Sequence, residues 1–144
     1  MSQTLDVNVL VYATDRGSPF HDKAKALVER FLTGPDLVYL LWPVAFGYLR
    51  IVTHPRLLDA PLSPDEAARN VDQFVAQPHV RFVGEDDGFW SVYRRVADSV
   101  RPKGNLVPDT HLVALMRQHG IATIWTHDLD FRRFEGITVR DPFD

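Results

Sequence analysis

Three aspartates of the sequence stand where apolar segments begin or end. Asp6 lies inside the apolar run that opens the chain, Asp128 follows the apolar residues 123–125, and Asp109 follows Pro108. A buried carboxylate without a partner is costly, and carboxylates gathered at one place repel one another unless a cation joins them. Mg²⁺ prefers oxygen ligands and keeps water molecules that can be activated. We therefore interpret Asp6, Asp109 and Asp128 as metal ligands and as the catalytic residues.

Each of these aspartates also has a purely structural explanation. Asp109 would stabilise the first turn of a helix through the helix dipole, and Asp128 with Asp130 would form an Asx turn. Asp6 is harder to explain in this way, because we place it within the first, apolar strand. The metal site is favoured because it accounts for all three positions at once.

The elements that would carry these residues alternate between strand and helix. We predict strands at residues 5–11 (passing into a helix within that run), 38–41, 80–83, 122–125 and 137–140. We predict helices at residues 20–32, 42–53, 63–77, 89–99 and from Pro108 to near Gly120. This alternation is typical of an α/β fold with a central, mostly parallel twisted sheet of about four or five strands and helices on both faces.

Such a sheet would bring the aspartates together. Functional groups of an open α/β sheet gather at the carboxyl ends of the strands. Asp6 and Asp128 would both lie at that edge, and Asp109 would join them if the N-terminus of its helix faces the same way.

Local signals mark several helix ends. Ser63 and Glu66 form a capping-box sequence around Pro64, and Asp86 or Asp87 would cap the helix at residues 89–99. On that helix, Phe89, Trp90 and Tyr93 have helical spacing, which favours a place in the core over a platform for stacking bases.

The bulk composition limits the class of protein. A chain of 144 residues suits one domain over residues 1–144, and the absence of cysteine excludes disulfides and thiolate zinc sites. The N-terminal segment predicts a strand rather than a signal peptide, and no run approaches the roughly 20 apolar residues of a membrane span. We therefore expect a cytoplasmic protein with no membrane partner.

A net charge of −3 argues against nucleic-acid binding by bulk charge, but basic residues flank the candidate ligands. They are Arg94, Arg95, Arg101 and Lys103 before Asp109, and Arg132 and Arg133 after Asp128. These residues would steer phosphate towards the site, or they would form an ordinary solvated face.

Four segments together resemble PIN-domain nucleases, and within them the VapC-type toxins. The segments are Leu5-Asp6-Val7-Asn8-Val9-Leu10; residues 42–56, ending in Thr53-His54-Pro55-Arg56; Gly104-Asn105-Leu106-Val107-Pro108-Asp109-Thr110-His111-Leu112; and Thr126-His127-Asp128-Leu129-Asp130-Phe131 with Arg132-Arg133-Phe134. Each motif is short, but their order and spacing over nearly the whole chain are specific.

The resemblance implies a PIN-like three-layer fold and a Mg²⁺-dependent endoribonuclease, with Mn²⁺ as a substitute, that cleaves RNA with metal-activated water. It implies Asp6, Asp109 and Asp128 as metal ligands, with Asp130 close by. Asn8, Thr126, Arg132 and Arg133 are predicted to contact the substrate, a tRNA or an rRNA. The resemblance further implies the toxin of a toxin–antitoxin pair, which forms a homodimer and a hetero-oligomer with a cognate VapB-like antitoxin.

The sequence departs from the family pattern at one position. PIN nucleases usually carry a glutamate on the helix after the second strand, where this chain has Gly47 or its neighbour Phe46. Between Asp36 and Asp59 the sequence has no acidic residue. One metal ligand of the usual set is therefore missing, and Asp130 or water would take its place.

Other classes of function stay open at this point. Asp6-x-Asn8 is similar to the Asp-x-Asp start of haloacid-dehalogenase-type phosphatases, but Asn8 cannot act as the required general acid. A PIN-like module that binds RNA or an antitoxin without cutting would also explain Gly47. His111 and His119 share a helix face without a third zinc ligand, and His127 beside Asp128 is either a proton shuttle or an exposed loop residue.

Overall fold

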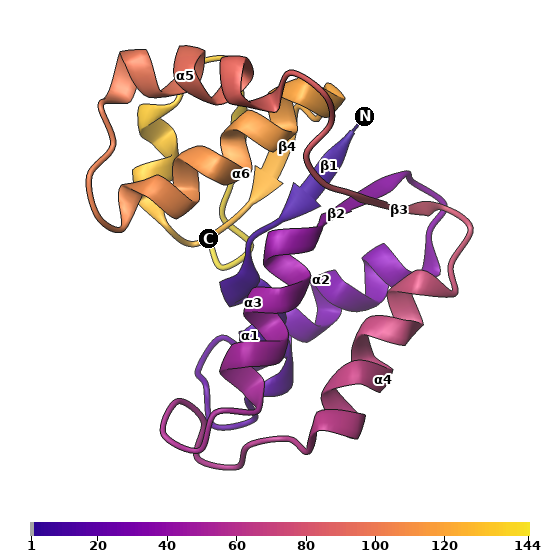
Figure 1. Cartoon of the computed structure of the whole chain (residues 1–144). Helices are drawn as coiled ribbons and strands as arrows, with labels where there is room; N and C mark the ends of the chain where they lie inside the picture. Colours follow the sequence, from indigo (N-terminus) through magenta and orange to yellow (C-terminus); the bar gives the residue numbers. More distant parts are fainter. Residues whose placement is uncertain (1) are drawn as a thin grey trace.

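The computed structural model of the chain describes residues 2–144, in which strands and helices alternate (Figure 1). In chain order the elements are β1 (Gln3–Leu5), α1 (Val7–Thr14), α2 (His21–Thr33), β2 (Val38–Leu41), α3 (Trp42–Val52), α4 (Pro64–Val75), β3 (Val80–Val83), α5 (Phe89–Val100), α6 (Leu106–His119), β4 (Thr123–Trp125), the 3₁₀ helix η1 (Leu129–Arg133) and β5 (Thr138–Arg140).

The five strands form one parallel sheet in the order β3-β2-β1-β4-β5. Crossovers between parallel strands are almost always right-handed, so the reversal of direction at β1 sends the helices to opposite faces. Helices α1 to α4 pack together on one face, and α5 and α6 pack together on the other (Figure 1). The predicted α/β class, with a parallel sheet between helical layers, is confirmed.

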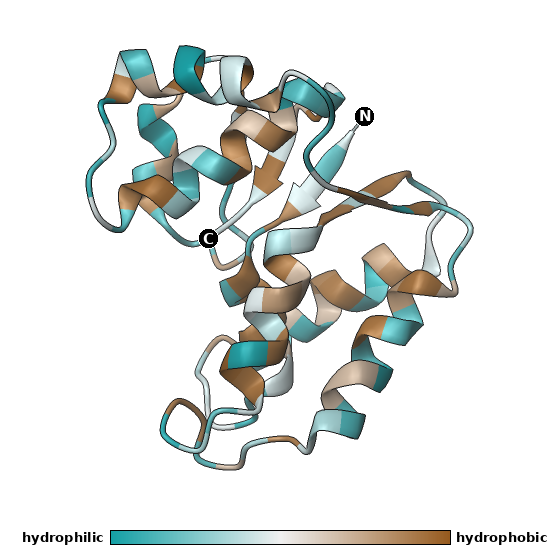
Figure 2. Ribbon diagram, viewed as in Figure 1, coloured by the Kyte–Doolittle hydropathy of each residue, from teal (hydrophilic) through white to brown (hydrophobic). Residues whose placement is uncertain are grey.

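The core lies between the sheet and the helices. Leu5, Leu40, Leu41 and Ile124 of the strands have at most 1% of their surface exposed. Figure 2 shows hydrophobic residues concentrated along the central strands and on the helix sides that face them. Apolar strands buried on both faces are typical of parallel sheets. Among residues 2–144, no helix has the length and apolar character needed to cross a bilayer.

The first strand is shorter than the sequence suggested. It ends at Leu5, and α1 begins at Val7, so Asp6 is the N-cap of a helix and not a strand residue. The Asp6 carboxylate accepts a hydrogen bond from the Val7 backbone N–H, which satisfies one donor of the first helical turn. The apolar run 7–11 therefore continues as helix, with Val9, Leu10 and Val11 buried.

Two predicted helix ends are confirmed, and two lie elsewhere. Ser63 and Glu66 form the capping box at the start of α4, and Gly120 ends α6 in the left-handed region. Helix α5 has Gly88 at its N-cap, without a side-chain cap, instead of Asp86 or Asp87. Helix α6 begins at Leu106 and not at Pro108. Pro108 is tolerated in the first turn, because the N–H that a proline lacks would have no helical partner there.

The prediction that Trp90 belongs to the core is wrong. Its side chain is 66% exposed, while Phe89 packs edge-on against His111 of α6. The aromatic spacing on α5 therefore spans two sides of the helix, one turned to α6 and the other to solvent.

Candidate metal centre

The candidate centre lies where the sheet reverses its strand order. The chain leaves β1 towards β2 on one side, and β4 pairs with β1 on the other side. In open α/β sheets, such a reversal opens a crevice at the carboxyl ends of the two central strands. Asp6 directly follows β1, Asp128 follows β4, and α6 runs back along the sheet, which brings its first turn with Asp109 to the same edge.

Asp6 is buried and held by two hydrogen bonds. Its residue is 5% exposed. One carboxylate oxygen accepts from the Val7 N–H at 2.7 Å, and the other accepts from the Thr126 hydroxyl at 2.9 Å. Burial raises the pKa of Asp6, the two hydrogen bonds act in the opposite direction, and the Asp128 charge raises it further. The carboxylate thus has a fixed orientation, and its oxygens keep lone pairs for a cation.

Thr126 links two of the aspartates. Its hydroxyl donates to Asp6 and accepts a hydrogen bond from the Asp128 backbone N–H at 3.0 Å. The residue is 1% exposed, so the hydroxyl is engaged inside the protein, although the sequence predicted a substrate contact. The Asp128 carboxylate in turn accepts from the Asp130 N–H at 2.9 Å and caps η1. The position of the loop at residues 126–130 therefore depends on the buried side chain of Thr126.

Three carboxylates of the centre lie close together, and the one basic side chain within residues 2–144 that pairs with them is Arg133, on Asp130. Ligand oxygens of Asp109, Asp128 and Asp130 all lie within 4.8 Å of one another. Burial, followed by the charges of Asp128, Asp6 and Asp130, raises the pKa of Asp109 to about 7. A half-buried group of hard oxygen ligands whose charges repel fits a divalent cation such as Mg²⁺ or Mn²⁺. Asp6 lies outside the group of three, but its charge acts on Asp109.

Gly47 lies beside this centre. A Cβ atom at Gly47 would be 3.4 Å from Cγ2 of Val7, the residue that follows Asp6. Helix α3 therefore approaches the first turn of α1 at the position where the family glutamate is missing. Its neighbour Phe46 is 63% exposed.

The other predicted substrate residues lie on the surface near the acids. Asn8 is exposed on the first turn of α1, and Arg132 and Arg133 are exposed in η1. The Arg133 Nε lies 3.8 Å from an oxygen of Asp130, as an exposed i,i+3 pair. These positions are compatible with contacts to a negatively charged ligand.

The histidines have partners other than a shared metal. His111 pairs with Glu85, and His119 bonds the Gly84 carbonyl oxygen. His127 pairs with Asp141 at 2.8 Å, and its ring packs against Phe20 and Phe143, which stack on each other. Asp141 is a residue that the sequence did not single out, because only the return of β5 brings it next to the Asp128 loop.

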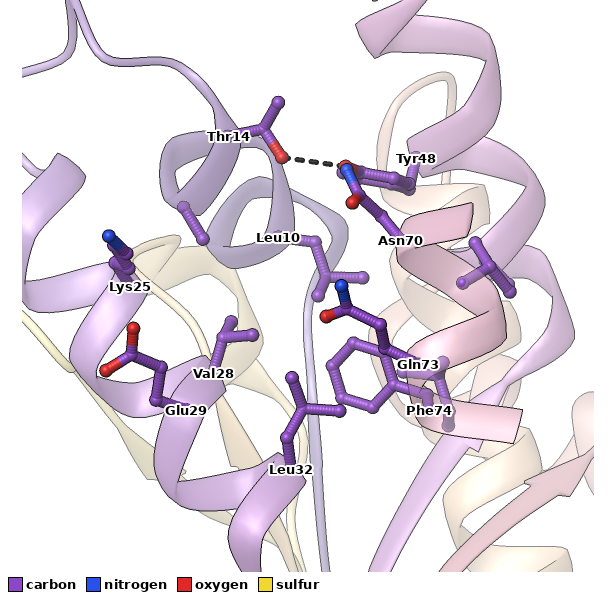
Figure 3. A pocket seen from close by; sticks show the side chains of 14 residues that line it. Leu10, Thr14, Lys25, Val28, Glu29, Leu32, Tyr48, Asn70, Gln73 and Phe74 are labelled. Atoms are coloured by element: carbon purple, nitrogen blue, oxygen red, sulfur yellow. Dashed lines mark hydrogen bonds between the residues drawn. The ribbon is translucent and has the colours of Figure 1, made fainter. Parts of the chain in front are cut away.

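A partly enclosed groove lies between α1, α2, α3 and α4, the helical layer on the other side of the sheet from α5 and α6 (Figure 3). It is lined by Leu10, Ala13, Thr14, Lys25, Val28, Glu29, Leu32, Leu40, Ala45, Tyr48, Asn70, Val71, Gln73 and Phe74. The Tyr48 hydroxyl contacts Thr14 at 2.7 Å and accepts from Asn70 at 2.9 Å. None of the four acids of the centre lines this groove, so the groove and the acidic centre are separate places on the molecule.

Fold and centre together define an α/β domain with a cluster of carboxylates, able to hold a metal ion, at the switch point of a parallel sheet. The PIN domain family matches residues 4–137. Ribonuclease VapC48 of Mycobacterium tuberculosis (strain ATCC 25618 / H37Rv) is 74% identical over 143 residues, which is 99% of each chain. The chain therefore belongs to the PIN-domain family and, within it, to the VapC group.

Solved structures show the same fold at low sequence identity. Mycobacterium tuberculosis VapC20, a sarcin–ricin loop cleaving toxin, has a TM-score of 0.65 and 18% identity and covers 94% of this chain and 98% of that chain. A toxin–antitoxin complex from Klebsiella pneumoniae has a TM-score of 0.67 and 13% identity and covers 99% of this chain and 98% of that chain.

Proposed function

We propose that this protein is a metal-dependent endoribonuclease and the toxin of a VapBC-type toxin–antitoxin pair. The observation that carries the proposal is the convergence of Asp109, Asp128 and Asp130 at the switch point, with the Asp6 charge acting on Asp109, in a chain 74% identical to a protein named ribonuclease. The excess of carboxylates is of use to a hydrolase that recruits a hard cation, whereas a protein that only binds RNA gains nothing from it.

The side chains of the centre have separate tasks in this proposal. Asp6, Asp109 and Asp128 would hold a Mg²⁺ ion, with Mn²⁺ as a substitute and Asp130 close by. When bound, the ion supplies Lewis-acid activation of water and of the phosphodiester. Thr126 keeps the Asp6 and Asp128 carboxylates in register through its two hydrogen bonds. Asn8, Arg132 and Arg133 are placed to contact the RNA backbone beside the acids.

The groove on the layer of α1 to α4 supports the antitoxin part of the proposal. It is mainly apolar at Leu10, Val28 and Phe74 and partly enclosed, which suits the apolar face of a partner helix. A solved relative in fold is a toxin–antitoxin complex. We propose that the single domain forms a homodimer, takes an antitoxin segment into this groove, and acts in the cytoplasm, where tRNA and rRNA are found.

Cleavage of RNA under controlled metal conditions tests the function. Protein stripped with EDTA should cut RNA only after Mg²⁺ or Mn²⁺ is added, and the products should carry 5′-phosphate and 3′-hydroxyl ends, as a water nucleophile implies. Asp109→Asn, purified in parallel, controls for contaminating nucleases. Equal cutting in EDTA would contradict the metal mechanism. Binding of RNA or of an antitoxin, without RNA cleavage in any metal, would favour the non-catalytic module. Phosphatase activity without RNA cleavage would favour the dehalogenase-type alternative.

A further inference from the structure

A pair of stacked aromatic rings on α5 joins the exposed Trp90 to Tyr93, which is partly buried against the core. Trp90 and Tyr93 stack with ring centroids 5.4 Å apart and an angle of 11° between their planes. The Trp90 side chain is 66% exposed. The side of α5 that faces α6 is formed by other residues, among them Phe89 and the fully buried Val96. Trp90 is therefore not needed to close the core, whereas Tyr93 holds it in place from a partly buried position.

Cationic side chains surround this pair in one shallow hollow. The hollow is lined by Trp90, Tyr93, Arg94, Ala97, Asp98, Arg101, Pro102 and Lys103. Arg94, Arg101 and Lys103 are exposed, and none of them forms an ion pair within residues 2–144. The hollow holds three cationic side chains and one carboxylate, that of Asp98, so it is positive in a chain whose net charge is −3.

The backbone at Arg101 adds a second observation. Arg101 caps the C-terminus of α5 with φ of 51°, in the left-handed region. Glycine adopts this conformation without a steric penalty, and it is the usual residue at such a helix end. The other described residues with positive φ are all glycines. An arginine at this position is unfavourable for the backbone. We therefore expect the Arg101 side chain to have a role that outweighs this cost.

A short loop joins the hollow to the helix that carries Asp109. Residues 101–105 connect α5 to α6, and Asp109 lies in the first turn of α6. Figure 1 shows this loop running from the end of α5 to the start of α6, so a strand bound along Arg101 and Lys103 would lie next to the segment that leads to Asp109. Flat rings and flanking cations are the combination that binds unpaired nucleotides, with rings stacking on bases and cations contacting phosphates. An apolar partner helix would have little use for three cations.

We propose that the Trp90–Tyr93 hollow binds an unpaired segment of the RNA substrate, stacks a base on Trp90, and leads the strand to the acidic centre. This inference rests on the proposed function. It assigns to α5 a role in substrate affinity that is separate from catalysis, because none of its residues belongs to the acidic centre.

Binding and cleavage are measured separately to test this role. The probe is a fluorescein-labelled single-stranded RNA of about ten nucleotides, a length within the range that such surfaces cover, and it is titrated in EDTA so that it is not cut. Trp90→Ala should weaken binding by about 5- to 150-fold, which corresponds to the loss of one stacked base. Trp90→Phe should retain most of the affinity and lose the quenching of tryptophan fluorescence by RNA.

The cations are tested with matched variants. Arg94→Ala and Arg101→Gly should each lower the slope of log affinity against log salt by about 0.7, the loss of one phosphate contact on a single strand. Arg101→Gly should leave the melting temperature unchanged or raise it, because glycine relieves the left-handed backbone. Arg69→Ala removes an exposed arginine from α4, on the other helical layer, and should leave the slope unchanged.

The outcomes separate this inference from the proposed function. If wild-type protein cuts RNA and the α5 variants raise KM with little change in kcat, both hold. If the α5 variants bind and cut RNA like wild type, the inference is wrong and the proposed function stands. If Trp90→Ala instead dissociates a homodimer or releases an antitoxin without changing RNA affinity, the hollow is a protein interface and the inference is also overturned. A wild type that binds RNA through Trp90 but never cuts it would refute only the function.

Discussion

At the scale of single residues, the centre concentrates negative charge that the fold itself does not neutralise. Asp6 is buried with both carboxylate oxygens hydrogen-bonded, while Asp109 faces Asp128 and Asp130. The repulsion between these carboxylates lowers the stability of the metal-free protein and favours the binding of a cation, as is common at functional sites. Two predictions follow from this balance of charges.

Substitution of the aspartates should separate catalysis from folding. Asp6→Asn and Asp109→Asn each remove a ligand, so we expect RNA cutting to be lost in both variants. The melting temperature in EDTA should stay the same or rise, because the variants remove repulsion and asparagine remains a good helix cap at position 6. Asp72→Asn on the exposed side of α4 is the control for a simple change of charge. Full activity in either variant would remove that residue from the catalytic set.

The raised pKa of Asp109 predicts how stability depends on pH. The pKa of Asp109 is about 7 in the folded protein, compared with about 3.9 for an unfolded aspartate. Its contribution to stability is therefore fully present below about pH 4 and is lost as the pH rises through about 7. In EDTA, the melting temperature of the wild type should fall relative to that of Asp109→Asn across this window. Mn²⁺ added at neutral pH should reverse the fall, since it binds the deprotonated folded state. Parallel curves for the two proteins would show that Asp109 titrates normally.

At the scale of elements, the centre depends on how closely α3 approaches α1. Gly47 faces Val7, which opens α1 directly after Asp6. Helix α3 is the element on which we expect the family glutamate, at Gly47 or its neighbour Phe46. Helix α6 contributes in a different way, because its direction brings Asp109 to the same edge as β1 and β4.

Restoring the acid at position 47 should strengthen metal binding. A Cβ at Gly47 would meet Val7 at 3.4 Å, close to ordinary van der Waals contact, and replacing a helical glycine gains up to about 1 kcal/mol. We expect Gly47→Glu to bind Mn²⁺ more tightly than the wild type in a calorimetric titration. Gly47→Gln, which has the same shape without the charge, should not. If both variants fold and neither improves binding, Gly47 does not correspond to the missing glutamate.

At the scale of the whole molecule, three functions are assigned to three places. The acidic centre occupies the carboxyl edge of the sheet, the apolar groove lies among α1 to α4, and the cationic hollow lies on α5. Because the sheet separates the two helical layers, an antitoxin and an RNA strand would approach from different sides. Inhibition by the antitoxin then requires that part of it also reach the acidic edge.

Filling the groove should weaken antitoxin binding without affecting catalysis. Gln73 is an exposed residue that lines the groove, and Gln73→Trp would occupy the space of an entering side chain. We expect at least a tenfold loss of affinity, about 1.4 kcal/mol, for a cognate VapB-like antitoxin. Val75→Trp, on the same helix but outside the groove, is the matched control. RNA cleavage by both variants should equal that of the wild type. Unchanged antitoxin affinity of Gln73→Trp would place the antitoxin elsewhere.

The sequence alone determined the class of fold and the candidate acids. Apolar segments with helical or strand spacing fix β2 and β3 to the residue, and the Ser63 capping box fixes the start of α4, because these signals are local. Local signals were weaker where one residue serves two elements. The apolar run at the N-terminus hid the change from strand to helix at Asp6, which only the cap hydrogen bond decides.

The tertiary structure decided what depends on distant segments. Thr126 and Asp6 are far apart in the sequence, and only the pairing of β1 with β4 joins them in a hydrogen bond. The raised pKa of Asp109 likewise arises from burial and from the charges of Asp128, Asp6 and Asp130, which lie on two other segments. The exposure of Trp90 followed from which side of α5 packs on α6, a choice that helical spacing leaves open, since either face of that helix carries aromatic residues.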